Sequence, residues 1–326
     1  MAWSTILCFQ DTPNAARYKV AEARSLFPSI PFLAEHRRFS ILHQIVTRMI
    51  ATSLDAALQF SSVDVDVLDA HERTPLHWAA ARGDRVAVAT LLRQGANPDA
   101  LDNIKQGPLR SSLKAADPAC TRLLIQGGAT LEMRDKWQQT SLRAAIYTTD
   151  AVAFSVVLLD AGADVNARCE QGNTALLEAV SSNHLPCVKV LLNYMADMSL
   201  GNNYGECPLQ KAIVENHHDI LEALLQCPRF TFKLPECSGT TVLHLAAEHG
   251  DVETLRLLAS RSDGSEIDTQ SRDKDGRTAV EIARKRMKCT AKQFDVEKSA
   301  HESGWDAAFY TLVNCFIALK CLKEVH

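Results

Sequence analysis

Hydrophobic and polar positions recur along most of this chain with a period of roughly 33 residues. Each period contains a short apolar run, a polar stretch and a second apolar run, which is typical of two short helices joined by a turn. One such helix pair cannot bury its own apolar face, so neighbouring pairs must stack. The period is easiest to follow at one apolar position, which is filled by Leu76, Leu109, Leu142, Leu176, Leu209, Leu243 and Val280.

The first helix of a period is predicted to begin at a threonine and a proline. Thr74 is placed to cap the helix N-terminus, and Pro75 follows in the first turn, where no backbone N–H is needed. Leu76, Ala79 and Ala80 share one face of this helix, and the small alanines let neighbouring helices approach closely. The sequence therefore predicts that this face is almost fully buried.

The second helix of a period is predicted to end at a glycine. Leu91 and Leu92 belong to the second apolar run, and we expect both to be almost fully buried in the same core. Gly95 stands where a left-handed backbone ends the helix at little cost. The residues from there to the next first helix carry turn-forming aspartates, which predicts a protruding, hairpin-like finger.

Two periods contain a related four-residue motif, Thr74-Pro-Leu-His77 and Thr241-Val-Leu-His244. Together with the Gly95-Ala96 helix end, these motifs make residues 37–287 resemble the ankyrin-repeat family. The resemblance implies an all-α ankyrin-repeat solenoid of about seven to eight helix-turn-helix units, with β-hairpin-like fingers and terminal capping helices. It also implies that His77 and His244 are structural residues whose hydrogen bonds tie one repeat to the next loop.

The chain is predicted to contain three segments. Residues 1–36 carry no repeat and are expected to form an N-terminal cap segment. Residues 37–287 hold the ankyrin repeats, of which the first, around Leu42 and His43, and the last are diverged. Residues 288–326 are expected to be a C-terminal capping helix region, because apolar residues recur there at helical spacing. A helix that docks another protein is the alternative for this last segment.

Charge and cysteine usage narrow the class of partner and the compartment. The net charge of −4 gives no bias toward nucleic acid or a membrane, so we expect neither as a partner. The ten cysteines include no Cys-x-x-Cys pair, so we expect free thiols in a reducing compartment and no metal site. These features predict a soluble, cytoplasmic protein. The basic run Arg284-Lys-Arg286 resembles a nuclear import signal, which keeps the nucleus open as an alternative.

The chain contains none of the common nucleophilic, phosphate-binding or zinc-protease motifs, so the sequence favours a binding protein over an enzyme, with no cofactor. The first hypothesis is an intracellular binding module or scaffold that engages a protein partner through its concave finger and inner-helix face. The chain also resembles the diverged ankyrin proteins of filamentous fungi, some of which serve biosynthetic pathways. The second hypothesis is therefore a small-molecule-binding or catalytic protein of secondary metabolism, with a pocket in the concave groove.

The finger tips are the strongest candidates for partner contact. The repeat pattern requires no large apolar residue there, because the tips project away from the helical core, yet several tips are aromatic or branched. Large rings present much contact area with little loss of entropy and are frequent binding anchors. We predict a contact centre around Trp137 and Tyr204 and no catalytic or metal-binding residue. The predicted binding residues are His71, Trp78, Arg82, Ile104, Trp137, Tyr147, Tyr204, Glu215 and His249.

Overall fold

The computed structural model describes residues 38–51, 53–58, 64–230, 240–261, 271–279, 281–283 and 285. This part of the chain contains helices and turns and no β-strand. It divides into two compact units, unit 1 up to Lys136 and unit 2 from Trp137 onward. The predicted cap segment of residues 1–36, the predicted capping region of residues 288–326 and most of the basic run 284–286 lie outside the described residues.

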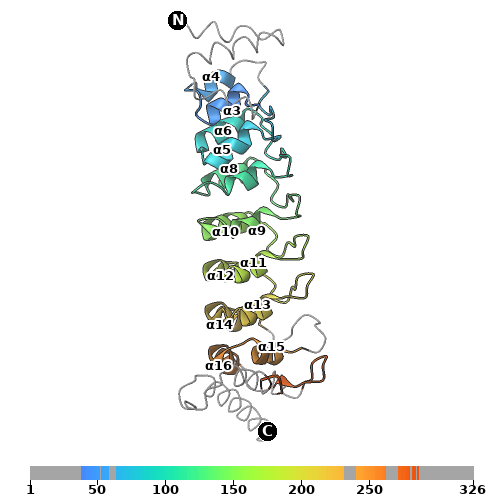
Figure 1. Cartoon of the computed structure of the whole chain (residues 1–326). Coiled ribbons are helices and arrows are strands. Elements are labelled where there is room, and N and C mark those ends of the chain that lie inside the picture. Colours follow the sequence, from blue (N-terminus) through green and yellow to red (C-terminus); the bar gives the residue numbers. More distant parts are fainter. Residues whose placement is uncertain are drawn as a thin grey trace, which may run out of the picture. The chain divides into compact units, whose positions relative to one another are not determined.

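Unit 1 contains three helix pairs in its described part, and the loops between pairs project to one side (Figure 1). The first helix of each pair packs against the first helix of the next, and the second helices pack likewise. We call the first helices inner and the second helices outer. The helices are α3 (Ile41–Val46), α4 (Leu54–Leu58), α5 (Pro75–Arg82), α6 (Arg85–Arg93), α7 (Pro108–Ser112) and α8 (Ala119–Gln126).

Unit 2 repeats the same arrangement with four described helix pairs (Figure 1). Residues 281–283 are again helical, where a further inner helix is expected to begin. The described helix pairs confirm the predicted all-α repeat fold. The helices are α9 (Ser141–Ala145), α10 (Ala151–Asp160), α11 (Ala175–Ser181), α12 (Leu185–Asn193), α13 (Pro208–Val214), α14 (His218–Gln226), α15 (Val242–Glu248) and α16 (Val252–Arg261).

The ends of α5 and α6 follow the predicted pattern. Thr74 is the N-cap of α5 and Pro75 is its first residue. Gly95, just after α6, has φ 85°, which confirms the left-handed helix end. Met195 occupies the same place after α12 with φ 66°, although it is not glycine. A left-handed backbone costs an L-residue roughly 1–2 kcal/mol, so the end of α12 carries strain that the glycine at the end of α6 avoids.

The core lies between the stacked helices and contains most of the predicted residues. Leu76, Ala79, Ala80 and Leu91 are fully buried. The prediction for Leu92 was wrong, because this side chain is only partly buried. Its methyl groups lie over Gly127, where an added Cβ would come within 2.9 Å of Leu92 Cδ1. Leu92 therefore packs against the edge of the next repeat instead of the centre of the core.

Candidate functional site

Fingers in both units are held by one side chain at the base. Asp69 Oδ1 accepts hydrogen bonds from the backbone N–H groups of His71 (2.7 Å) and Arg73 (2.9 Å). In unit 2, Asn202 Oδ1 accepts the equivalent bonds from Tyr204 and Glu206, both at 3.0 Å. Such side-chain bonds fix the turn without a β-ladder. The finger therefore presents its tip residue from a defined backbone.

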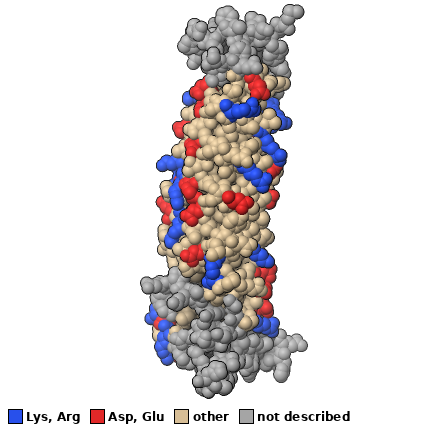
Figure 2. Space-filling model, turned by 180° about the vertical axis from the view of Figure 1, so that it is seen from behind, with Lys and Arg blue, Asp and Glu red and all other residues tan. Residues whose placement is uncertain are grey.

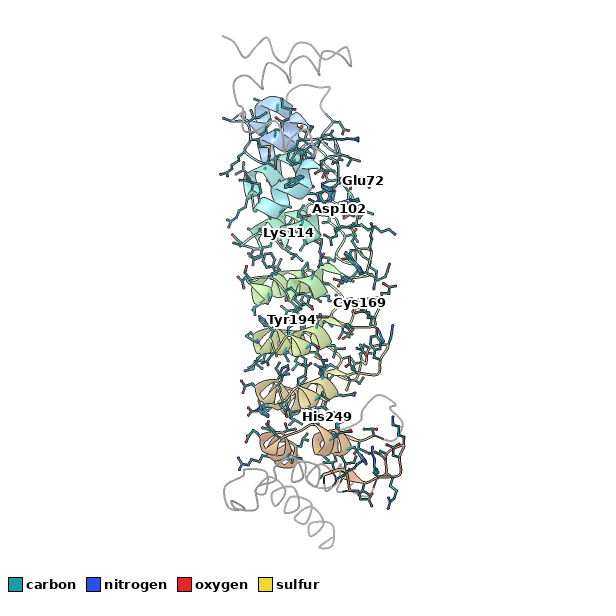
Figure 3. All side chains as sticks on the ribbon, viewed as in Figure 1. Glu72, Asp102, Lys114, Cys169, Tyr194 and His249 are labelled. Carbon is teal, nitrogen blue, oxygen red and sulfur yellow. The ribbon has the colours of Figure 1, made fainter. Side chains whose placement is uncertain are left out.

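Neighbouring fingers within a unit are joined through their backbones. In unit 2 the Glu170 N–H donates to the carbonyl of Trp137 (3.3 Å), and the Asn203 N–H donates to the carbonyl of Gln171 (3.0 Å). In unit 1 the Asn103 N–H donates to the carbonyl of His71 (3.0 Å). The tips of successive fingers therefore form a row. Figure 3 shows Asp102 of a unit 1 finger to one side of Lys114, which follows α7, and Cys169 of a unit 2 finger to one side of Tyr194, which follows α12.

The motif histidines have the structural bonds that the sequence predicts. His77 Nδ1 accepts from the Thr74 N–H (3.1 Å), and His77 Nε2 donates to the carbonyl of Gln106 (3.0 Å) in the next finger. His244 repeats this bridge to the carbonyl of Arg277 at 3.0 Å. Burial lowers the pKa of His77, which favours the neutral ring that can accept at Nδ1. These bridges tie each repeat to the finger that follows it.

Among the predicted binding residues of unit 1, three lie at or near the surface. His71 is exposed at its finger tip, and Ile104 is partly buried at the next tip. Arg82 is exposed at the end of α5, and its guanidinium donates to the carbonyl of Thr47 (2.9 Å). Arg82 therefore links two repeats, which limits its freedom to contact a partner.

Trp78, the fourth predicted residue of unit 1, is held by its own unit. Its indole Nε1–H donates to Asp69 Oδ2 (3.0 Å), and its ring meets that of Phe39 edge-on at 5.2 Å. The guanidinium of Arg73 lies 5.6 Å from the ring centroid. These contacts give Trp78 a structural function, because its side chain holds the finger that begins at Asp69. Contact of Trp78 with a partner stays a prediction.

Three aromatic side chains of unit 2 in the predicted set are more than half exposed. The exposed fraction is 51% for Trp137, 62% for Tyr147 and 75% for Tyr204. Trp137 and Tyr204 are finger-tip residues, whereas Tyr147 follows the inner helix α9. Exposed side chains of this size are costly to leave in water unless something covers them. Their function in binding stays a prediction, because the geometry displays them but shows no ligand.

Glu215 lies beside two charged residues that the sequence analysis did not select. Lys211 Nζ is 3.0 Å from Glu215 Oε1 and 3.7 Å from Glu206 Oε1. The hydrogen bond to Glu215 raises the pKa of Lys211. The i,i+4 spacing on a helix could have revealed the first contact, but the second joins a finger to a helix. His249 is exposed after α15, and its backbone carbonyl accepts from Asn216 Nδ2 at 3.5 Å.

Aromatic and charged residues of unit 2 that are exposed or partly exposed occur at repeated positions of the fingers and inner helices. We call this set the inner face of unit 2. Its members are Trp137, Tyr147, Tyr204, Glu206, Lys211, Glu215 and Glu248.

A buried ion pair holds two inner helices of unit 2 together. Arg143 of α9 and Glu178 of α11 approach to 2.5 Å, and their side chains are 9% and 11% exposed. Arg143 stands where His77 stands in its own repeat, so an ion pair replaces the histidine bridge here. Buried charges have a structural explanation when paired in this way, so we assign neither residue to catalysis.

A cavity in unit 2 tests the alternative hypothesis of a small-molecule site. Its volume is about 450 Å³, and none of the nine predicted binding residues lines it. Asp197, the acidic residue in its lining, accepts hydrogen bonds from the backbone N–H and the hydroxyl of Ser199 at 2.8 and 2.7 Å. Arg229 in its wall donates to the carbonyls of Leu192 and Ala196. The polar groups of the cavity therefore serve the fold, and no general acid and base face each other in it.

The surface of the described residues carries charges of both signs (Figure 2). The face in Figure 2 shows acidic and basic side chains interspersed, without a large patch of one sign. Within the same residues, no group of His, Cys, Asp or Glu is arranged to hold a metal ion. None of the helices described is long and apolar enough to cross a membrane.

Comparison with known families gives matches in both units. A family described as "Ankyrin repeats (3 copies)" matches residues 142–234, and one described as "Ankyrin repeat" matches residues 71–103 and 238–273. Alpha-latrotoxin-Lg1a of Latrodectus geometricus is 31% identical over 125 residues, which cover 38% of this chain and 9% of the toxin. Human ankyrin repeat domain-containing protein 63 is 33% identical over 108 residues, which cover 32% of this chain and 28% of that protein. The chain thus spans only a small part of these relatives.

A solved structure covers a larger share of the chain. The crystal structure of the ankyrin repeat domain of Bcl-3, a member of the IkappaB protein family, superposes with a TM-score of 0.59 and 29% identity. The match covers 65% of this chain and 95% of that domain. The superposition extends over several repeats. It therefore shows that the repeat fold is shared, and it assigns no function to any one residue of the inner face.

Proposed function

Because this chain is an ankyrin-repeat protein, we propose that it is a binding module that engages a protein partner through its fingers and inner helices. Ankyrin repeats are protein-interaction modules in general. The proposal assigns the contact to the inner face of unit 2, with Trp137 and Tyr204 at its centre. It further assigns the protein to the cytoplasm or nucleus, in keeping with the free cysteines of the described residues.

The observation that carries this proposal is the exposure of large rings where the fold does not need them. Trp137, Tyr147 and Tyr204 are each more than half exposed. The equivalent places in other repeats hold residues such as Gln171 and Ser181, so packing does not demand a ring. Rigid aromatic side chains are enriched among residues that dominate binding energy. The display of Trp137 and Tyr204 on fingers and of Tyr147 beside an inner helix favours protein recognition over catalysis.

Site-specific photo-cross-linking in the native cell tests the proposal. A photoreactive phenylalanine analogue is introduced at Trp137 or Tyr204 and, as a control, at Val86, a 74% exposed residue of the outer helix α6. We expect one protein to be cross-linked from both inner-face positions and not from Val86. The same adducts from all three positions, or adducts from Val86 alone, would contradict the proposed face. Extraction of small molecules with the purified chain checks the alternative hypothesis in the same cells.

A further inference from the structure

The charge at two inner positions changes sign between individual repeats. Two residues after the finger tip, unit 1 has Arg73, whereas unit 2 has Glu206 in one finger and Arg277 in the last described finger. Six residues after the repeated leucine, unit 1 has Arg82 where unit 2 has Glu215. The repeats between them carry uncharged residues at both positions, namely Gln106, Gln139, Asn173, Ala115, Thr148 and Ser182. The fold does not require this distribution, since the same positions accept either sign.

On the inner face of unit 2, carboxylates therefore accompany exposed rings. Glu206 and Glu215 approach one ammonium group, that of Lys211, from a finger and from a helix. Tyr204 is two residues from Glu206 on the same finger and is 75% exposed. Glu248 is exposed at the equivalent end of the next inner helix, α15. Lys211 lies among Glu206 and Glu215, whereas Glu248 has Arg277 of the last described finger as a neighbouring cation.

We propose that the inner face of unit 2 binds an arginine-bearing segment of the protein partner. The proposal rests on the proposed function and specifies the chemistry of what the exposed rings contact. A guanidinium stacks on tyrosine and tryptophan and forms paired hydrogen bonds with a carboxylate. A surface that offers rings and carboxylates together matches both properties. Glu206 and Glu215 already share Lys211, and an acidic or purely apolar segment would add no favourable pairing to them.

Lys211 shows that a cation is stable between Glu206 and Glu215. Its ammonium group also competes with a partner's arginine for these carboxylates. Its ammonium group lies 3.0 Å from Glu215 Oε1 and 3.7 Å from Glu206 Oε1. A lysine is a point charge and cannot pair with both carboxylates in the flat geometry of a guanidinium. An arginine from a partner would therefore displace Lys211 from these carboxylates. Removing the lysine charge should strengthen the binding of an arginine segment, while removing the carboxylates should weaken it.

The test measures peptide binding to the full chain by fluorescence anisotropy. The probes are labelled synthetic peptides of alternating arginine and serine, lysine and serine, or glutamate and serine. The variants are Glu206→Gln with Glu215→Gln, Lys211→Met and Tyr204→Ala. Glu222→Gln, on the exposed side of the outer helix α14, is the matched control. Circular dichroism and thermal unfolding of every variant exclude loss of folding as the cause of weaker binding.

We expect the arginine peptide to bind the parent chain more tightly than the other two peptides. The affinity for this peptide should fall about tenfold in the double glutamine variant and about threefold in Tyr204→Ala. Lys211→Met should strengthen the same peptide several-fold, a gain that damage to the fold cannot produce. Glu222→Gln should leave the affinity for the arginine peptide unchanged. Equal binding of arginine and lysine peptides, no effect of the glutamine variant, or self-association of the chain through this face would overturn the proposal. A partner cross-linked at Trp137 or Tyr204 but lacking arginine at the contact would leave the proposed function intact and contradict this inference alone.

Discussion

The buried pair of Arg143 and Glu178 offers a sharp test of how the repeats of unit 2 are held together. Both side chains are about nine-tenths buried and lie 2.5 Å apart, so each relies on the other for its counter-charge. Glu178→Ala removes the acid and leaves a guanidinium in a site with little access to water. Breaking a buried pair in this way costs about 3–5 kcal/mol, much more than its net contribution to stability.

The chain itself supplies the compensating double variant. Leu177 stands in the next repeat at the position of Arg143, and Ala144 stands in the preceding repeat at the position of Glu178. Arg143→Leu with Glu178→Ala therefore installs residues that other repeats already accommodate. Because no buried charge remains, we expect the double variant to lie within about 1–2 kcal/mol of the parent.

Urea unfolding followed by circular dichroism measures both effects. The control is Glu253→Ala, which breaks an exposed pair with Arg256 whose side chains are 50% and 63% exposed. Glu253→Ala should lower the free energy of unfolding by less than about 1 kcal/mol. If Glu178→Ala costs no more than the control, or if the double variant is as unstable as the single one, the ion pair is not what holds α9 and α11 together.

Other predictions concern the core, the histidine bridge and the finger turns. Leu176→Ala should cost about 2–5 kcal/mol by opening a cavity, and an unchanged unfolding midpoint would show that Leu176 is not a core residue. Because burial lowers the pKa of His77, the unfolded chain takes up a proton first as the pH falls. The free energy of unfolding should therefore keep the whole contribution of neutral His77 above about pH 6.5 and decrease below it. In His77→Gln this decrease, measured by urea unfolding, should be smaller. Gly172→Ala should destabilise the chain, because φ is +80° and the new Cβ would lie 2.5 Å from Asn203 Oδ1. Gln138→Gly should stabilise it by about 1 kcal/mol, since Gln138 has the same left-handed backbone, and thermal unfolding of the two variants should shift in opposite directions.

The sequence predicts the repeated parts of this fold well, because each part depends on residues close together in the chain. Thr74 and Pro75 determine where a helix starts, and Gly95 determines where the next one ends. Leu76 and Ala80 are buried because their spacing places them on one face of a short helix. Leu92 departs from its prediction because its environment comes from Gly127 in the next repeat.

The candidate site depends on contacts between repeats, which periodicity does not reveal. The 35-residue separation of Arg143 and Glu178 hides their pairing in the sequence. Glu206 was missed for the same reason, since it meets Lys211 only where a finger folds back on its helix. Comparing charges at equivalent positions, as between Arg73 and Glu206, is the signal that could have identified it.

The central claim is that the exposed rings of unit 2 contact a protein partner, and one titration tests it most directly. The partner identified by cross-linking is titrated by calorimetry against the parent chain, Trp137→Ala with Tyr204→Ala, and the control Val86→Ala. Both ring side chains are more than half exposed, so unfolding of the double variant should match the parent. The account predicts that the double variant loses more than about 2 kcal/mol of binding free energy while the control loses none. Equal affinity of all three proteins would contradict it.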